Sequence, residues 1–214
     1  ITGALVPRTS TNARPHARAR ATCARPSLMA LSAHKLYGPK GVGALYVRHN
    51  HSLPKPLAQL HGGGHEKGFR SGTLNVPGIV GFGKAAQLRI QEMTEESNRL
   101  DGLRNRLEKG LLELPGVHRN GSMKNRLAHV SNLSFSGVEG EELLLKVNQQ
   151  VAVSSGSACT SISPKPSHVL QAMGIPSDLG RASLRFSLGK DTRAETVEHA
   201  VSCVKSVIEQ LRNS

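Results

Sequence analysis

The amino-acid sequence predicts an α/β fold, and three observations support that prediction. The chain has 214 residues, which is long enough to bury a substantial core in one or two domains. Short apolar runs typical of strands alternate with stretches of helical periodicity, the pattern of layered α/β domains. One such run, Ala44 to Val47, follows a glycine-punctuated turn, as expected for a loop that leads into a buried strand.

The elements follow in order along the chain. A strand is expected at Leu28–Leu31 and another at Ala44–Val47, followed by a long helix over residues 76–114 that Pro115 and Gly116 end. Four leucines at helical spacing mark the buried side of that helix: Leu100, Leu103, Leu107 and Leu111. Strands are then expected at 130–135, 151–153 and 183–188, and helices at 139–149, 167–173 and 194–211. The last helix carries the apolar stripe Val197, Ala200, Val201, Val204, Ile208 and Leu211.

The net charge of +13 is unevenly distributed. Residues 1–65 hold nine Lys or Arg and no acid, so the remainder carries 19 basic against 15 acidic residues. Aromatic residues make up 3% of the chain and are absent from residues 1–26, which argues against base stacking on a nucleic acid. We expect no nucleic-acid partner, although a basic nucleic-acid-binding arm on an inert α/β domain is the alternative.

Residues 1–26 are rich in Arg and Pro and show no apolar period. This composition is typical of a disordered or foreign segment, and a transit peptide is the alternative. Three cysteines and no membrane-length apolar run favour a reducing compartment without a membrane span. We expect a cytoplasmic protein, or a mitochondrial or plastid one if residues 1–26 are a transit segment. Because the chain begins with Ile, we also expect it to be a truncated form.

A lysine, Lys35, lies in the glycine-punctuated turn. Glycines let a backbone turn tightly or approach a ligand closely. A partly desolvated lysine loses proton affinity and becomes a nucleophile that can form a Schiff base with a carbonyl. A second glycine-rich loop, Gly62 to Gly64, lies between His61 and His65. These histidines lack the fixed spacing that a helix would give a zinc pair, so we expect no metal site.

The three cysteines differ in setting. Cys159 lies in a run of small polar residues after a short apolar strand, where an accessible thiol can act as a nucleophile. Cys203 flanks the apolar stripe of the last helix and is expected to pack, whereas Cys23 lies in the basic arm and is not expected to react. Arg185 alternates with Leu184 and Phe186, which places it on the polar face of a strand. It could bind a carboxylate there, or could simply be solvated.

These segments carry a resemblance to a known family. The motifs are Ser-Ala-His-Lys-Leu-Tyr-Gly-Pro-Lys-Gly from Ser32, Gly-Gly-Gly-His-Glu from Gly62 with Arg-Ser-Gly-Thr after it, Ser-Ser-Gly-Ser-Ala-Cys-Thr-Ser from Ser154, and Ser-Leu-Arg-Phe-Ser-Leu-Gly from Ser183. In this order and spacing they resemble the cysteine desulfurases of the aminotransferase class-V group. That group has fold type I and uses pyridoxal 5′-phosphate (PLP). The resemblance runs from about Leu28 to the end and covers the C-terminal half of the family's chain.

The resemblance implies a role for each motif residue. Lys35 would be the Schiff-base lysine, and Cys159 would take sulfur from L-cysteine as a persulfide. Ser32 and His34 would bind the PLP phosphate, and Thr73 would reach the phosphate of a neighbouring subunit's cofactor. Arg185 would hold the substrate carboxylate. The implied partners are a sulfur acceptor or iron–sulfur scaffold protein and, in the family, a second subunit of a homodimer.

The family residues that precede the lysine strand have no counterpart in residues 1–26. They include the aspartate that pairs with the pyridine nitrogen, the histidine that stacks on the ring and a phosphate loop. We therefore expect this chain to bind PLP weakly or not at all and its activity to be doubtful. The expected organisation is a foreign segment (1–26), a remnant of a large PLP-binding domain (27–96) and a small α/β domain (97–214). Alternatives are a selenocysteine lyase-like enzyme on the same fold and a non-catalytic remnant or binding module.

Overall fold

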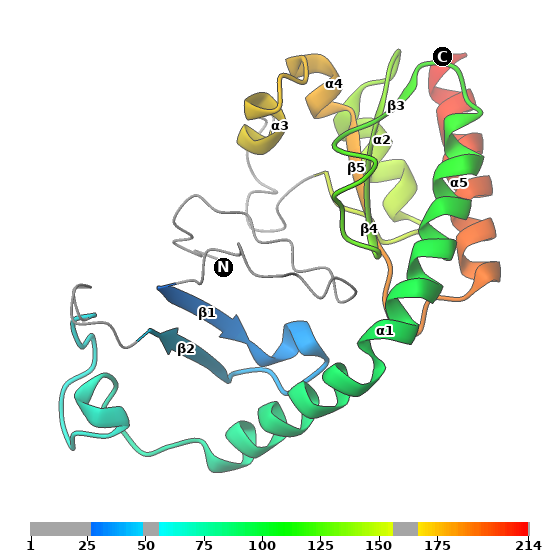
Figure 1. Ribbon diagram of the computed structural model, residues 1–214. Helices are drawn as coiled ribbons and strands as arrows, with labels where there is room; N and C mark the ends of the chain where they lie inside the picture. The colour runs from blue at the N-terminus through cyan, green and yellow to red at the C-terminus, as the bar shows by residue number, and fades with distance from the viewer. Residues whose placement is uncertain (1–26, 49–55, 156–166, 214) are drawn as a thin grey trace. The chain divides into compact units, whose positions relative to one another are not determined.

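The computed structural model describes residues 27–48, 56–155 and 167–213 (Figure 1). The chain divides into two compact units, residues 1–93 and 94–214, which are described separately here. The domain boundaries predicted at residues 26/27 and 96/97 stay predictions. In the part of the chain that the structure describes, no helix is both long enough and apolar enough to cross a membrane.

Unit 1 begins with a pair of strands, both predicted from their apolar runs. Strand β1 (Leu28–Ser32) pairs antiparallel with β2 (Gly43–Val47), in a register from Leu28 opposite Val47 to Ser32 opposite Gly43. The pair is antiparallel because a short connection, residues 33–42, returns the chain directly. That connection contains the 3-10 helix η1 (Ala33–Leu36).

Helix α1 (Val76–Leu112) was predicted to run two residues further. A turn replaces its last residues, in which the Leu114 amide donates to the Leu111 carbonyl at 3.2 Å. Gly116 then takes a φ of +69°, which glycine adopts without strain. A second 3-10 helix, η2 (Glu66–Gly68), lies in the loop before α1 and was not predicted.

Unit 2 is built on a three-stranded antiparallel sheet of order β3-β4-β5. Its strands are β3 (Val117–Arg119), β4 (Val130–Phe135) and β5 (Ser183–Ser187). Its further helices are α2 (Gly140–Asn148), α3 (His168–Ala172), α4 (Ser177–Arg181) and α5 (Ala194–Arg212). The predictions of β4, β5, α2, α3 and α5 are confirmed to within two residues at each end, whereas β3 and α4 were missed.

The predicted strand at residues 151–153 is wrong. The Val151 amide donates to the Val147 carbonyl at 2.9 Å, and the Val153 amide donates to the Asn148 side chain at 2.9 Å. Both amides therefore form hydrogen bonds to the C-terminal end of α2, so they cannot bond to a neighbouring strand. Pairing with β5 begins only at Ser154, which forms an isolated bridge with Arg185.

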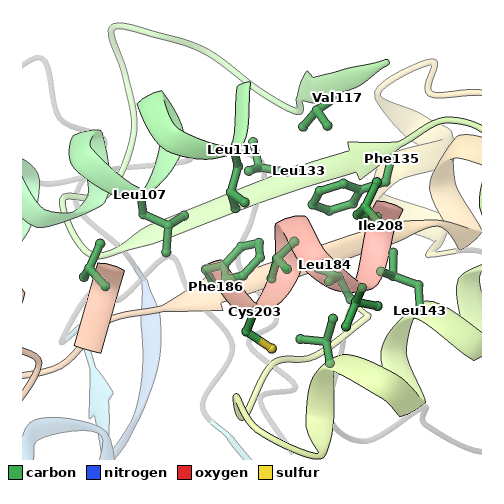
Figure 2. Packing of buried hydrophobic residues seen from close by; sticks show 14 of the residues in the cluster. Leu107, Leu111, Val117, Leu133, Phe135, Leu143, Leu184, Phe186, Cys203 and Ile208 are labelled. Carbon is green, nitrogen blue, oxygen red and sulfur yellow. The ribbon is translucent and has the colours of Figure 1, made fainter. Parts of the chain in front are cut away.

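One face of the sheet packs against α1, α2 and α5 to form the core of unit 2 (Figure 2). The two predicted helical stripes are confirmed, since their members are buried in this core or packed against it. Phe135, Leu133 and Leu184 contribute the buried side chains of the sheet. Cys203 is also part of the core, as predicted, and burial raises the pKa of its thiol.

A buried carboxylate, Glu108, ties α1 to the sheet. Arg119 donates to it at 2.9 Å, Ser131 donates to it at 2.6 Å and Arg126 forms an ion pair with it. Burial by itself raises the pKa of Glu108, but the hydrogen bonds from Arg126, Ser131 and Arg119 together lower it below its usual 4.5. Glu108 is therefore ionised in the folded unit at neutral pH.

We expect Glu108→Gln to lower the free energy of unfolding by about 3 kcal/mol at pH 7, because Arg119 and Arg126 lose a buried counter-ion. Since folding lowers the pKa of Glu108, its contribution is complete above the unfolded value and is lost as the pH falls through the folded value. The difference between the two proteins should therefore shrink below about pH 4. Urea unfolding at several pH values measures this, with the exposed Glu113→Gln as the control. A loss for Glu113→Gln equal to that for Glu108→Gln would contradict the prediction.

Two glycines of α1 should respond oppositely to alanine. A Cβ at Gly110 would lie 2.7 Å from Val201 of α5, whereas a Cβ at Gly102 would have nothing within 4 Å. Gly102→Ala should stabilise the fold by about 0.5–1 kcal/mol through helix propensity. Gly110→Ala should destabilise it by about 1–3 kcal/mol through overpacking. Thermal unfolding of both variants tests this, and equal stabilisation by both would show that α5 does not pack closely here.

Candidate functional site

The turn that carries Lys35 is fixed by main-chain contacts. The Ala33 amide donates to the Val42 carbonyl at 3.1 Å, and the Gly38 amide donates to the Ala33 carbonyl at 2.9 Å. Ala33 is fully buried, while the next two side chains, His34 and Lys35, are exposed. The turn thus buries its backbone and presents an imidazole and an amine to the outside. The desolvation that the sequence suggested for Lys35 is not provided by the described residues of this unit.

Close packing holds this turn against α1. A Cβ at Gly38 would lie 3.0 Å from the Ala85 Cβ, and one at Gly81 would lie 3.0 Å from Pro39. The Arg89 guanidinium also lies over the ring of Tyr37, 5.3 Å from its centroid. The glycines therefore allow a contact between the turn and the helix that larger residues would prevent.

Ser32 lies where β1 enters the turn. It occupies the N-cap of η1, but its side chain makes no capping hydrogen bond. Its partner in the register is Gly43, where a Cβ would lie 2.5 Å from the Leu31 carbonyl oxygen. Ser32, His34 and Lys35 thus lie within one turn. Their hydroxyl, imidazole and amine could all contact one ligand that carries an anionic group and a carbonyl.

The second glycine-rich loop closes on itself through side chains. The Ser71 hydroxyl accepts from the Gly64 amide at 3.2 Å, and His65 Nδ1 accepts from the Gly72 amide at 3.3 Å. The Ser71 amide also donates to the Leu60 carbonyl at 3.2 Å. His65 therefore has a structural role here. Thr73 follows this closed loop directly and is exposed, in the same unit as Lys35.

The loop gives no sign of a metal centre. Among residues 27–48, 56–155 and 167–213, no three His, Cys, Asp or Glu side chains are placed to hold a metal ion together.

Arg185 lies in unit 2, on the sheet face opposite the core. It is half-buried and directly opposite Asn132 of β4, whereas its neighbours Leu184 and Phe186 are buried in the core. The predicted alternation is therefore confirmed. On its other side the Arg185 main chain exchanges two hydrogen bonds with Ser154, at 2.6 and 3.3 Å. Ser154 thus uses both the amide and the carbonyl of Arg185, and the Arg185 side chain is left to interact with a ligand.

A polar network covers the same sheet face and was missed by the sequence analysis. Asn120 Nδ2 donates to Asn132 at 2.6 Å and to Ser134 at 2.7 Å, and Ser134 and Ser183 hydroxyls lie 2.7 Å apart. Ser183 also donates to the Leu179 carbonyl at 2.7 Å. The alternation of Asn132 and Ser134 with buried residues was the signal that could have revealed this face.

Cys159 and Cys23 lie outside the described residues, so their predicted roles stay predictions. Of the remaining predicted site residues, the structure brings Ser32, His34 and Lys35 together on one turn. Thr73 lies on a separate loop of that unit, and Arg185 lies in the other unit. Two main-chain hydrogen bonds link Ser154 to Arg185 of β5.

Comparison with known proteins agrees with these motifs. The aminotransferase class-V family matches residues 20–199. This chain belongs to the aminotransferase class-V family. Its curated relatives include a cysteine desulfurase IscS of Anaeromyxobacter sp. (strain Fw109-5), which is 56% identical over 86% of this chain and 46% of the relative. The predicted family is therefore confirmed, and the chain spans about half the length of the curated relatives it matches.

Solved structures confirm the predicted fold. A NifS-like protein superposes with a TM-score of 0.74 at 32% identity, over 86% of this chain and 47% of that protein. A structure of SspA in complex with cysteine superposes with a TM-score of 0.55 at 34% identity, over 76% of this chain and 44% of that protein. Both again match about half of a longer chain.

The described residues fit PLP in part. Ser32, His34 and Lys35 present a hydroxyl, an imidazole and an amine on one turn, which suits a phosphate and an aldehyde. A carboxylate for the pyridine nitrogen has no evident source, since Glu66 and Glu92 are the only acids of residues 1–93. Of the aspartates, Asp101 accepts from Arg104 at 2.5 Å and from Asn105 at 3.1 Å within α1. The described residues of unit 1 thus offer groups that suit the phosphate and the aldehyde, but no aspartate for the pyridine nitrogen.

Proposed function

We propose that residues 28–214 are the C-terminal half of a PLP-dependent cysteine desulfurase that converts L-cysteine to L-alanine. The observation that carries this proposal is the 56% identity to a cysteine desulfurase over 86% of this chain. The solved relative in complex with cysteine supports the choice of substrate. In this proposal Lys35, Cys159 and Arg185 act on the substrate, while Ser32, His34 and Thr73 bind the cofactor phosphate.

Each residue has a task that its setting allows. Arg185 would bind the substrate carboxylate through two parallel N–H donors, because its guanidinium has the fork geometry that matches a carboxylate and its main chain is already held by Ser154. When bound, PLP supplies an electron sink for the charge that develops at the substrate's Cα. The amine of Lys35 would move the proton at that carbon, since it is exposed beside His34 on the turn.

Sulfur transfer would occur at Cys159. Its thiolate would attack the sulfur of the substrate, forming a sulfur–sulfur bond as the substrate's carbon–sulfur bond breaks. The electron pair of the broken bond stays with carbon, which is protonated to give alanine, and the outer sulfur remains on Cys159 as a persulfide. A sulfur acceptor or iron–sulfur scaffold protein would then take that sulfur, and the complete enzyme would be a homodimer.

Cofactor binding by the chain itself should be weak. We expect the purified 214-residue chain to show little of the visible absorbance of lysine-bound PLP, because the contact to the pyridine nitrogen is missing. Titration with PLP, with Lys35→Ala as the control, measures this. A stoichiometric band that Lys35→Ala removes would show that the chain completes the site alone.

Activity can be tested in a chimera. Residues 28–214 would replace the matching segment of the Anaeromyxobacter relative, and sulfide release from L-cysteine would be measured. We expect Cys159→Ser to abolish release, and Arg185→Ala to lower kcat/KM about 10- to 100-fold through KM, because charge-assisted hydrogen bonds to the carboxylate are lost. Arg185→Lys should recover only part, since it lacks the fork geometry.

Arg181→Ala serves as the matched control, because Arg181 is an exposed arginine of the same unit. Full activity of the Cys159→Ser chimera, or an equal effect of Arg181→Ala and Arg185→Ala, would contradict the proposal. Preference for selenocysteine over cysteine by the chimera would favour a selenocysteine lyase instead.

A further inference from the structure

The outer face of the unit 2 sheet carries a row of three polar side chains that run from strand to strand. Asn132 of β4 lies opposite Arg185 of β5, and on its other side the Asn120 amide donates to the Asn132 carbonyl at 2.9 Å. All three residues are half-buried. The described strand residues that share this face include no Asp or Glu, so Arg185 has no counter-ion among them.

Asn132 and Arg185 form a close side-chain pair. The Arg185 amide and carbonyl both bond to Ser154, and the Asn132 carbonyl bonds to Asn120. These main-chain groups point away from the opposite strand, which identifies a non-hydrogen-bonded pair of an antiparallel ladder. In such pairs the Cα atoms lie about 4.5 Å apart, and side chains on one face approach each other most closely. The Asn132 amide and the Arg185 guanidinium can therefore contact the same ligand.

The direction of each hydrogen bond in the polar network follows from its buried end. Ser183 donates its one hydroxyl proton to the Leu179 carbonyl at 2.7 Å. The Ser134 hydroxyl, 2.7 Å from that of Ser183, therefore acts as the donor between these two groups. Ser134 is then an acceptor toward Asn120, so the Asn120 atom that lies 2.7 Å from it is the donor Nδ2. Both serines are fully buried, so water does not compete for these bonds.

The same Asn120 Nδ2 fixes the orientation of the Asn132 amide. It lies 2.6 Å from Asn132, where Oδ1 is the side-chain atom that can accept. The Asn132 Nδ2, with two N–H donors, is then the end left for the side of the row where Arg185 lies. In the part of the chain that the structure describes, neither this Nδ2 nor the Arg185 guanidinium has a hydrogen-bond partner. A neutral donor beside a cationic donor suits a carboxylate.

We propose that Asn132 is a second substrate-binding residue, whose Nδ2 donates to the carboxylate that Arg185 binds. Asn120 is the positioning residue that keeps this donor turned toward the carboxylate. The inference rests on the proposed function for the identity of the substrate, L-cysteine. The neutral amide adds a hydrogen bond without a second positive charge that would repel Arg185. Asn132→Asp would instead pair with Arg185 and repel the carboxylate.

Carboxylate binding is measured first in the full 214-residue chain without PLP. Nuclear magnetic resonance follows the Asn132 side-chain amide during titration with acetate, and chloride at the same ionic strength is the reference. Asn132→Ala identifies the signal, because that variant lacks it. We expect a saturable shift with acetate alone that Arg185→Ala removes. No saturable shift at Asn132, or a shift that Arg185→Ala leaves unchanged, would overturn the proposal.

Kinetics in the chimera with the Anaeromyxobacter relative compare two substitutions of Asn132. We expect Asn132→Ala to raise KM for L-cysteine about tenfold and Asn132→Asp to raise it at least about 50-fold, with kcat within about threefold in both. Asn132→Asp keeps an oxygen that accepts from Asn120, so a purely supporting role predicts the reverse order. Asn213→Asp is the matched control, because it adds the same charge at an exposed residue of unit 2.

The positioning role of Asn120 is tested by Asn120→Asp. This substitution removes the donor to Asn132 Oδ1, so the Asn132 amide turns and no longer presents Nδ2 to the carboxylate. We expect KM to rise about tenfold. Because Asn120 acts through Asn132, adding Asn120→Asp to Asn132→Ala should raise KM no further. Additive effects would show that Asn120 acts independently of Asn132.

Failure of this inference is distinguishable from failure of the proposed function. A chimera without activity on L-cysteine, together with acetate binding that depends on Asn132 and Arg185, would contradict the desulfurase and support the carboxylate site. An active chimera in which Asn132→Asp leaves KM unchanged, or raises it less than Asn132→Ala does, would overturn the inference alone. Thermal unfolding checks that each variant is folded.

Discussion

The contact between the Lys35 turn and helix α1 depends on the absence of side chains at Gly38 and Gly81. A Cβ at Gly38 would lie only 3.0 Å from the Ala85 Cβ, and a Cβ at Gly81 would lie only 3.0 Å from Pro39. Within the turn, main-chain hydrogen bonds join Ala33 to Val42 and Gly38 to Ala33. His34 and Lys35 are then left to face outward. Lys35 is thus positioned by a turn that packs on α1 through Gly38 and Gly81, with Arg89 over the Tyr37 ring beside them.

Local periodicity explains most of what the sequence predicted. The period of 3.6 residues located α1 and α5, and the period of two located β4, β5 and the outward side chain of Arg185. The segment at residues 151–153 failed because its amides bond to Asn148 and to the end of α2. Short apolar runs do not reveal which acceptor is nearby. β3 has three residues, too few for a period to be read, and α4 (Ser-Asp-Leu-Gly-Arg) has one large apolar side chain and a glycine, so no apolar pattern marks it.

The candidate site was predictable in its motif residues but not in their surroundings. Lys35 stood out because a glycine-rich turn follows it. Arg185 stood out because it alternates with apolar residues. The partners of Arg185, Asn132 and Ser154, come from distant parts of the sequence, and only the fold pairs them. The Asn120 network depends in the same way on strand register. Alternation within one strand can indicate its polar face, but it does not indicate which residue of another strand lies opposite.

The two hydrogen bonds between Ser154 and Arg185 use main-chain atoms alone. Any substitution of Arg185 other than proline therefore keeps the strand joined to the segment that leads to Cys159. Side-chain chemistry and structural support are separable at this position. The same bonds make the two segments one mechanical unit at that point, so a shift of β5 along its axis would be transmitted to Ser154. The side chain of Arg185 is therefore not needed to hold Ser154 to β5.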